Sequence, residues 1–237
     1  MRLVLASASP ARRATLSAAG ITPIVRVSTV DEDALLASLP GGRALSGGTT
    51  TPADEVGALA AAKCSDVCEA LRRGDAELPA GEPVLVVGCD SMLEIGGQML
   101  GKPHTPEVAR ERIAAMRRTT ATLWTGHSAA ILAPLPSQGD ARSSHGEERR
   151  VERQVTRSAS TLVHFGDISD AEIEAYVATG EPLHVAGSFT VDGLGGPFIE
   201  GVTGDYHSVV GISMPLLRSM ATELGVFWPD LWDAPRP

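Results

Sequence analysis

Short apolar runs alternate along the chain with longer segments that carry helix signals. Residues 2–6 and 84–88 are almost wholly apolar, a pattern typical of strands buried on both faces. Further strands are predicted at 24–30, 123–132, 162–165, 198–199 and 208–210. Because strands and helices alternate, the pattern predicts the α/β class.

Helices are predicted where a favoured capping residue precedes a proline or an acidic residue. Ser9-Pro10 and Thr105-Pro106 each place an N-cap before a proline, which suits the first helical turn. Ser169 and Glu172 have the spacing of a capping box. The predicted helices cover residues 10–19, 52–73, 170–179 and 215–224, and a further helix begins at Pro106 with apolar positions at Val108, Ile113 and Met116.

Two segments break this alternation. Residues 134–158 are polar, charged and poor in aromatic side chains, which predicts an exposed insertion, either a loop or a long protruding hairpin. Residues 226–237 are expected to form a C-terminal tail. The whole chain, residues 1–237, is expected to form one domain with two lobes, because 237 residues suit one large domain or two small ones across a cleft.

Composition narrows the classes of protein. The hydrophobic fraction of 43% is ordinary for a globular protein, and no apolar run approaches the roughly 20 residues that span a bilayer, so no membrane partner is expected. The short apolar start, residues 3–6, lacks the length of a signal-peptide core, which indicates a cytoplasmic protein. A net charge of −9 argues against a general nucleic-acid binder but leaves a single nucleotide possible as a ligand.

The three cysteines favour a reducing compartment. Cys64 and Cys68 lie four residues apart in a predicted helix, and Cys89 precedes Asp90. No histidine lies near the first two, so small apolar side chains on a helix face are favoured over a zinc site.

The segment from Val84 to Pro103 carries the strongest candidate chemistry. Asp90 follows the apolar run 84–88, and carboxyl ends of strands are where open α/β folds place ligand sites. Lys102 follows a hairpin predicted at Gly96-Gly97, and a lysine near the carboxylate indicates an anionic substrate. The spacing from Gly96 to Lys102 approaches a P-loop, but Pro103 stands where that motif needs Ser or Thr.

A second candidate lies at the first predicted helix. Exposed N–H groups at a helix start bind anions, so Ser9, Arg12 and Arg13 are candidate phosphate contacts. The helix dipole makes arginine unfavourable at a helix N-terminus, so the position of Arg12 and Arg13 indicates a function. The alternative is that both are solvated surface arginines. Glu32, one of three consecutive acids, is either part of a solvated turn or a partner of Asp90 in holding a hard cation.

Taken together, these motifs resemble the Maf family of nucleoside triphosphate pyrophosphatases, also called septum formation inhibitors. The resemblance is carried by LASASPARR, VVGCDSML with LGKP, EIEAYVATGEPLHVAGSFTVDGLGG and FIEGVTGDYHSVVGISMPLL. It implies a mixed twisted sheet with flanking helices and two lobes around a central cleft (Maf/ITPase-like). It further implies cleavage of a free nucleoside triphosphate to the monophosphate and pyrophosphate with a divalent metal, Mg²⁺ or Mn²⁺, and a possible homodimer.

The resemblance also implies roles for individual residues. Asp90 matches the active-site aspartate, which would hold the metal with Glu32 and orient or deprotonate the attacking water. Ser9 and Arg12 match the N-terminal phosphate motif, with Arg13 beside them. Lys63 and Lys102 match the two lysines that line the cleft.

Two positions depart from the family pattern. Ala11 replaces the first arginine of a common SPRR motif. Asp192 stands where many relatives that act on thymidine and uridine triphosphates have glutamine, and an ionised aspartate only accepts hydrogen bonds. The substitution therefore predicts a substrate other than these two nucleotides, with the particular base left open. Two other classes remain as alternatives: a nucleotide-binding regulator of cell division with little turnover, and an NAD-binding module that rests only on loose glycines.

Overall fold

A single seven-stranded sheet forms the centre of the protein, seen here in a computed structural model that describes residues 1–75, 77–135 and 147–233. The strands follow the order β2-β1-β3-β5-β6-β7, and β4 pairs with β3 outside this path. β1 pairs in parallel with β2 and β3, whereas the other pairs are antiparallel, so the sheet is mixed as predicted. The strands are β1 (Arg2–Leu5), β2 (Ile24–Val25), β3 (Val84–Ile95), β4 (Gln98–Leu100), β5 (Thr120–Pro134), β6 (Arg149–Phe165) and β7 (Ile199–Thr203).

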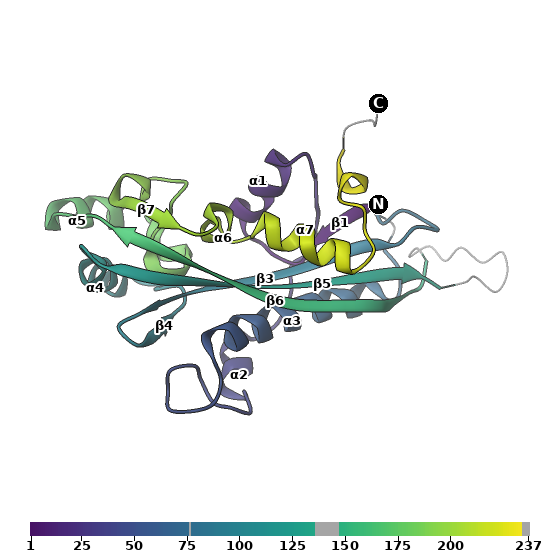
Figure 1. Ribbon diagram of the computed structural model, residues 1–237, viewed down its shortest axis with the longest axis horizontal. Coiled ribbons are helices and arrows are strands. Elements are labelled where there is room, and N and C mark those ends of the chain that lie inside the picture. Colours follow the sequence, from purple (N-terminus) through teal and green to yellow (C-terminus); the bar gives the residue numbers. More distant parts are fainter. Residues whose placement is uncertain (76, 136–146, 234–237) are drawn as a thin grey trace.

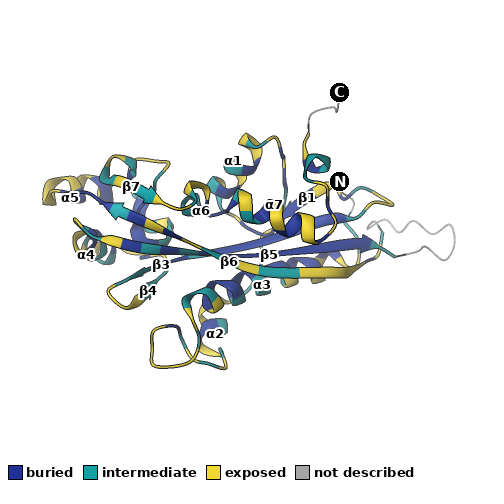
Figure 2. Ribbon diagram, viewed as in Figure 1, coloured by how far each residue is buried: buried dark blue, intermediate teal, exposed yellow. Residues whose placement is uncertain are grey.

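Helices cover both faces of the sheet, as Figure 1 shows, with α1, α6 and α7 on one face and α2 and α3 on the other. Figure 2 shows most of β3 and β5 in dark blue, because these central strands are covered on both sides. The fold class predicted from the sequence is thus confirmed. The helices are α1 (Pro10–Ala18), α2 (Glu32–Ala37), α3 (Pro52–Leu71), α4 (Pro106–Met116), α5 (Asp170–Ala178), α6 (Tyr206–Val210) and α7 (Met214–Glu223).

The hydrophobic core consists of separate clusters along the strands. One packs α1 and α7 against β1, β3 and β5, and a second packs α3 against the opposite face of the same strands. A third lies at the other end, where α4 and α5 pack against β5 and β6. The C-terminal segment joins the first cluster through Val226 and Leu231, and the N-terminal ammonium donates to the carbonyl of Asp230.

Most predicted helices are confirmed, together with their capping residues. Ser9, Thr105 and Ser169 each accept a hydrogen bond from the backbone of the first helical turn. The capping box between Ser169 and Glu172 is complete. Local sequence signals therefore place these helix starts without help from tertiary contacts.

Several strand predictions need correction. The strand predicted at 24–30 ends at Val25, because its partner β1 ends at Leu5. The strand predicted at 208–210 is instead α6, which begins after the capping carboxylate of Asp205. The strand predicted at 162–165 begins at Arg149, because β6 pairs with β5 in a long hairpin despite its polar sequence. Of the predicted insertion 134–158, residues 136–146 lie outside the described residues.

The most consequential correction concerns β3. Asp90 does not follow the end of this strand but lies inside it, because the ladder with β5 continues from Val84 to Glu94. The other edge of β3 has different partners along its length: β1 pairs as far as Val87, and β4 begins pairing at Leu93. Within the part of the chain that the structure describes, the edge between these two points pairs with no strand. Asp90 lies in the middle of this gap.

Candidate active site

Three charged side chains from separate elements meet at the gap in the sheet. Nζ of Lys63, a residue of α3, lies 2.5 Å from Oδ1 of Asp90 and 2.7 Å from Oε1 of Glu32, the first residue of α2. The Asp90 side chain is 9% exposed and that of Lys63 13%, whereas Glu32 is 47% exposed. The structure therefore brings together the two predicted carboxylates and one of the predicted lysines, and leaves the group open on the Glu32 side.

The short distance between α3 and the sheet explains how Lys63 reaches Asp90. Gly126 of β5 pairs directly with Asp90, and a Cβ atom at this position would lie 2.0 Å from the carbonyl oxygen of Val56 in α3. Only glycine permits this approach of helix to sheet. Gly126 is therefore part of the site architecture, although it contributes no side chain.

Burial and charge act in opposite directions on the two carboxylates. Burial raises the pKa of Asp90 above its ordinary value, and the charges of Lys63 and Arg12 only partly oppose it. For Glu32 burial also acts to raise the pKa, but the charges of Lys63, Lys102 and Arg12 outweigh it, so the pKa is lowered. A buried carboxylate with a raised pKa beside an ionised one is an arrangement suited to proton abstraction from water.

Arg12 is buried behind the carboxylates and forms hydrogen bonds within the protein. Its guanidinium donates to two carbonyl oxygens and two hydroxyl oxygens, those of Gly211, Cys89, Ser7 and Ser91. The bond to Cys89, 2.9 Å long, satisfies a carbonyl beside Asp90 near the unpaired edge of β3. Arg12 thus holds the backbone of the site and contributes positive charge to it.

Arg13 has a different environment from its neighbour. It is exposed and lines an open pocket of about 380 Å³ beside the first turn of α1. Ser9 also lines this pocket, while its hydroxyl accepts a hydrogen bond from the backbone N–H of Arg12. The remaining lining residues are Ser7, Ala8, Pro10, Ala14, Ser17 and Val25. Hydroxyl groups, a helix start and the exposed side chain of Arg13 make this pocket suitable for an anion.

Lys102 and Asp192 are both exposed, but only Lys102 is tied to the site. The charge of Lys102 contributes to the lowered pKa of Glu32, after the larger effects of burial and of Lys63. Asp192 lies in a turn after Thr190, and no interaction connects it with Asp90 or Lys63 among the described residues. Glu181 holds this turn by accepting hydrogen bonds from the N–H groups of Leu194 and Gly195.

His127 pairs in the sheet with Cys89, the neighbour of Asp90, and was not singled out from the sequence. Its Nε2 accepts a hydrogen bond of 2.8 Å from the N–H of Ser213, at the cap of α7, and its Nδ1 contacts the carbonyl of Thr125. Burial and the nearby charge of Arg12 lower the pKa of His127 to about 4, so the ring is neutral at pH 7. No local motif marks such a residue, because its role depends on β5 and α7 meeting in space.

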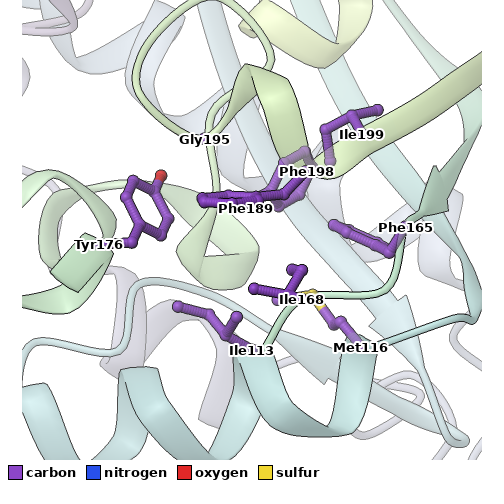
Figure 3. Close-up of a pocket in the computed structure, with 9 residues that line it drawn as sticks. All are labelled: Ile113, Met116, Phe165, Ile168, Tyr176, Phe189, Gly195, Phe198 and Ile199. Carbon is purple, nitrogen blue, oxygen red and sulfur yellow. The ribbon is translucent and has the colours of Figure 1, made fainter. Parts of the chain in front are cut away.

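An apolar cavity in the third cluster is too small for a ligand. Figure 3 shows Phe165, Phe189, Phe198 and Tyr176 gathered around it. Its volume is about 10 Å³, which is the room for a single water molecule. It is a packing defect beside the 190–196 turn rather than a binding site.

Other motifs from the sequence have structural roles. Cys64 and Cys68 are buried between α3 and the sheet, and Asp205 caps α6. Within the described ranges, no three side chains of the His, Cys, Asp or Glu type are grouped so as to hold a metal ion by themselves. In those ranges there is also no helix with the length and apolar character of a membrane span.

The mixed sheet, with its charged group around Asp90, belongs to a chain that matches a known protein family. The family model described as Maf-like protein matches residues 2–224, and the chain belongs to this family. Similar proteins that carry the name nucleoside triphosphate pyrophosphatase include the following three. The protein from Rhodococcus jostii is 47% identical over 97% of this chain and 95% of its own length, and that from Nocardia farcinica is 47% identical over 98% and 97%. The protein from Streptomyces coelicolor is 45% identical over 98% and 94%.

Proposed function

We propose that this protein is a nucleoside triphosphate pyrophosphatase. It hydrolyses the phosphoanhydride between the α and β phosphates of a free nucleotide and releases the monophosphate and pyrophosphate. The observation that carries the proposal is the buried Asp90, held by Lys63 at the unpaired edge of β3 and facing Glu32. The names and extensive identity of the relatives support the same activity.

Each residue of the cleft has a role in this reaction. Asp90 accepts the proton of the attacking water, and its raised pKa brings it closer to neutral pH as a base. Lys63 holds the Asp90 carboxylate in place. Lys102 and the first turn of α1, with Arg13 beside it, supply positive groups for the triphosphate. Phosphoryl transfer requires mainly such positioning and charge neutralisation.

A divalent cation, Mg²⁺ or Mn²⁺, fits the oxygen donors of this cleft. Asp90 and Glu32 would hold it, because both carboxylates lie within ion-pair distance of the same Lys63 ammonium and are therefore near each other. Magnesium typically takes one or two protein carboxylates and completes its shell with water and phosphate oxygens. Bound there, the cation would neutralise developing charge on the phosphates.

Asp192 is proposed to influence the choice of base. Its carboxylate is exposed on a turn that Glu181 fixes, so a ligand has access to it. An ionised carboxylate accepts hydrogen bonds only, which favours a base with adjacent N–H donors, such as guanine, or the amino group of cytosine.

Ala11 removes one positive group from the phosphate motif. Such an enzyme would clear modified or surplus nucleotides in the cytoplasm, where the free thiols of the three cysteines remain reduced.

The test is pyrophosphate release from a panel of common and modified nucleoside triphosphates, with Mg²⁺ or Mn²⁺. The wild-type protein is expected to turn over at least one of them, and Asp90→Asn to lower kcat by about 100-fold or more. Asp33→Asn is the matched control, because Asp33 is an exposed acid next to Glu32. Nucleotide binding without turnover in the wild type would instead favour a regulator of cell division.

A further inference from the structure

The backbone on both sides of Lys102 is held in place. On one side, the carbonyl of Gly101 accepts hydrogen bonds from Nη1 of Arg112, at 2.8 Å, and from the N–H of Gly187, at 3.2 Å. On the other side, Pro103 is buried and its carbonyl accepts a hydrogen bond of 2.8 Å from the N–H of Thr105. Lys102 is the exposed residue between these two fixed points. The direction in which its side chain leaves the backbone is therefore set by its neighbours.

Arg112 has an unusual environment for an arginine of α4. It is partly buried, and burial lowers its pKa, with only the charge of Glu111 opposing that effect. Among the described residues, no carboxylate lies within ion-pair distance of its guanidinium. Arg110, on the same helix, pairs with Glu174 and Glu107 at the surface instead. Within the described residues, no ion pair compensates the burial of the Arg112 guanidinium. The contact that it makes is the hydrogen bond to the carbonyl of Gly101.

The second donor depends on an equally specific arrangement. Gly187 adopts a left-handed conformation with φ of 72°, and a Cβ atom there would lie 2.7 Å from the side chain of Leu93. Glycine at this position brings the segment around it against β3 and directs its N–H to the carbonyl of Gly101. Side chain and backbone donors from distant parts of the sequence therefore converge on one oxygen atom.

We propose that Arg112 is a positioning residue that fixes Lys102 for contact with the triphosphate. A lysine has a long, flexible side chain, so a fixed backbone direction limits the volume that its ammonium samples. The inference depends on the proposed pyrophosphatase activity, because Lys102 acts there on the phosphates. It assigns to α4, which contributes no group to the cleft, a part in the reaction.

The test is a double-mutant cycle on kcat and KM with Arg112→Ala, Lys102→Ala and the double variant. Arg112→Ala is expected to lower kcat by about 10-fold to 100-fold, as a displacement near 1 Å does in other enzymes. The double variant is expected to be no slower than Lys102→Ala, within about two-fold, because Arg112 acts through Lys102. Arg112→Lys, which keeps a donor, should recover part of the rate, and Arg110→Ala should leave it unchanged.

Two results would overturn the inference. In one, the effects of Arg112→Ala and Lys102→Ala multiply in the double variant, which would show independent roles. In the other, Arg112→Ala lowers only the melting temperature and leaves kcat per folded molecule unchanged, which would show a structural role alone. A wild-type protein that releases no pyrophosphate would reject the proposed function itself, and the two failures are thereby distinguished.

Discussion

Nζ of Lys63 lies 2.5 Å from Oδ1 of Asp90. The helix α3, which covers one face of the sheet, therefore holds the candidate base in the centre of the sheet. The contact lowers the pKa of Asp90, but burial has the larger effect and the pKa remains raised. The folded protein therefore keeps a carboxylate in a setting that disfavours its charge. An unfavourable electrostatic environment of this kind is typical of catalytic groups and is seldom retained for stability.

Asp90→Asn is expected to raise the melting temperature at neutral pH while it removes activity. Because the folded pKa of Asp90 is raised, its contribution to stability is complete below the ordinary carboxyl pKa and is lost as pH rises through the folded value. The gain should therefore shrink toward acidic pH. Glu32→Gln should show the opposite sign, because the folded pKa of Glu32 is lowered. Thermal unfolding from pH 4 to pH 8 measures both, and equal effects of the two variants would contradict this account.

Lys63→Met is expected to shift the acidic limb of the profile of kcat/KM against pH to higher pH. Removal of the ammonium leaves burial less opposed, so the pKa of Asp90 rises further. Lys102→Met is the control, since its charge acts on Glu32 and is not among the main influences on Asp90. An unchanged limb in Lys63→Met would mean that Asp90 is not the titrating base.

Gly126→Ala is expected to cost about 1–3 kcal/mol of unfolding free energy, because the added methyl group collides with the backbone of α3. Activity should fall further than stability, since the helix that carries Lys63 must move. Gly57→Ala is the control in the same interface: its Cβ atom would lie 3.4 Å from Oγ of Ser158, an ordinary contact. This control should gain up to about 1 kcal/mol from helix propensity. Denaturant unfolding and kcat measure the contrast.

Replacement of Arg12 is expected to lower the unfolding free energy, whereas replacement of Arg13 is expected to change nucleotide binding. Arg12→Ala should cost about 2–4 kcal/mol of unfolding free energy, because buried carbonyl and hydroxyl groups lose a charged donor. Arg13→Ala should change the unfolding free energy by less than about 0.5 kcal/mol and raise KM for the nucleotide instead. Urea unfolding with steady-state kinetics separates the two, and a stable Arg12→Ala protein would disprove the structural role of Arg12.

Asp192→Asn and Asp192→Gln are expected to alter the ranking of nucleotides more than the rate of pyrophosphate release from the best one. An amide donates as well as accepts, so it can pair with a thymine or uracil edge that a carboxylate disfavours. The measurement is kcat/KM across the nucleotide panel for the wild type and both variants. A wild-type preference for thymidine and uridine triphosphates would contradict this role of Asp192.

Local signals account for the parts of the fold that were predicted correctly. The capping residues Ser9, Thr105 and Ser169 act on the next helical turn, so their effect is visible in the sequence alone. Strand limits depend on partners instead. Asp90 was expected after a strand because polarity begins there, yet pairing with β5 continues through it. The same dependence extended β6 to Arg149 and shortened β2 to Val25.

The sequence by itself determined the α/β class, the starts of five helices and the residue types of the site, because composition, periodicity and capping act over a few neighbouring positions. Only the tertiary structure decided how those residues are used. It turned Arg12 inward and left Arg13 at the pocket, and it placed Asp90 in a gap between two strand partners. Gly126 and Arg112 carry no local motif, since the roles assigned to them come from contacts with elements distant in the chain. Such contacts exist only after the sheet has assembled. For this reason, the local sequence pattern does not predict the roles of these two residues.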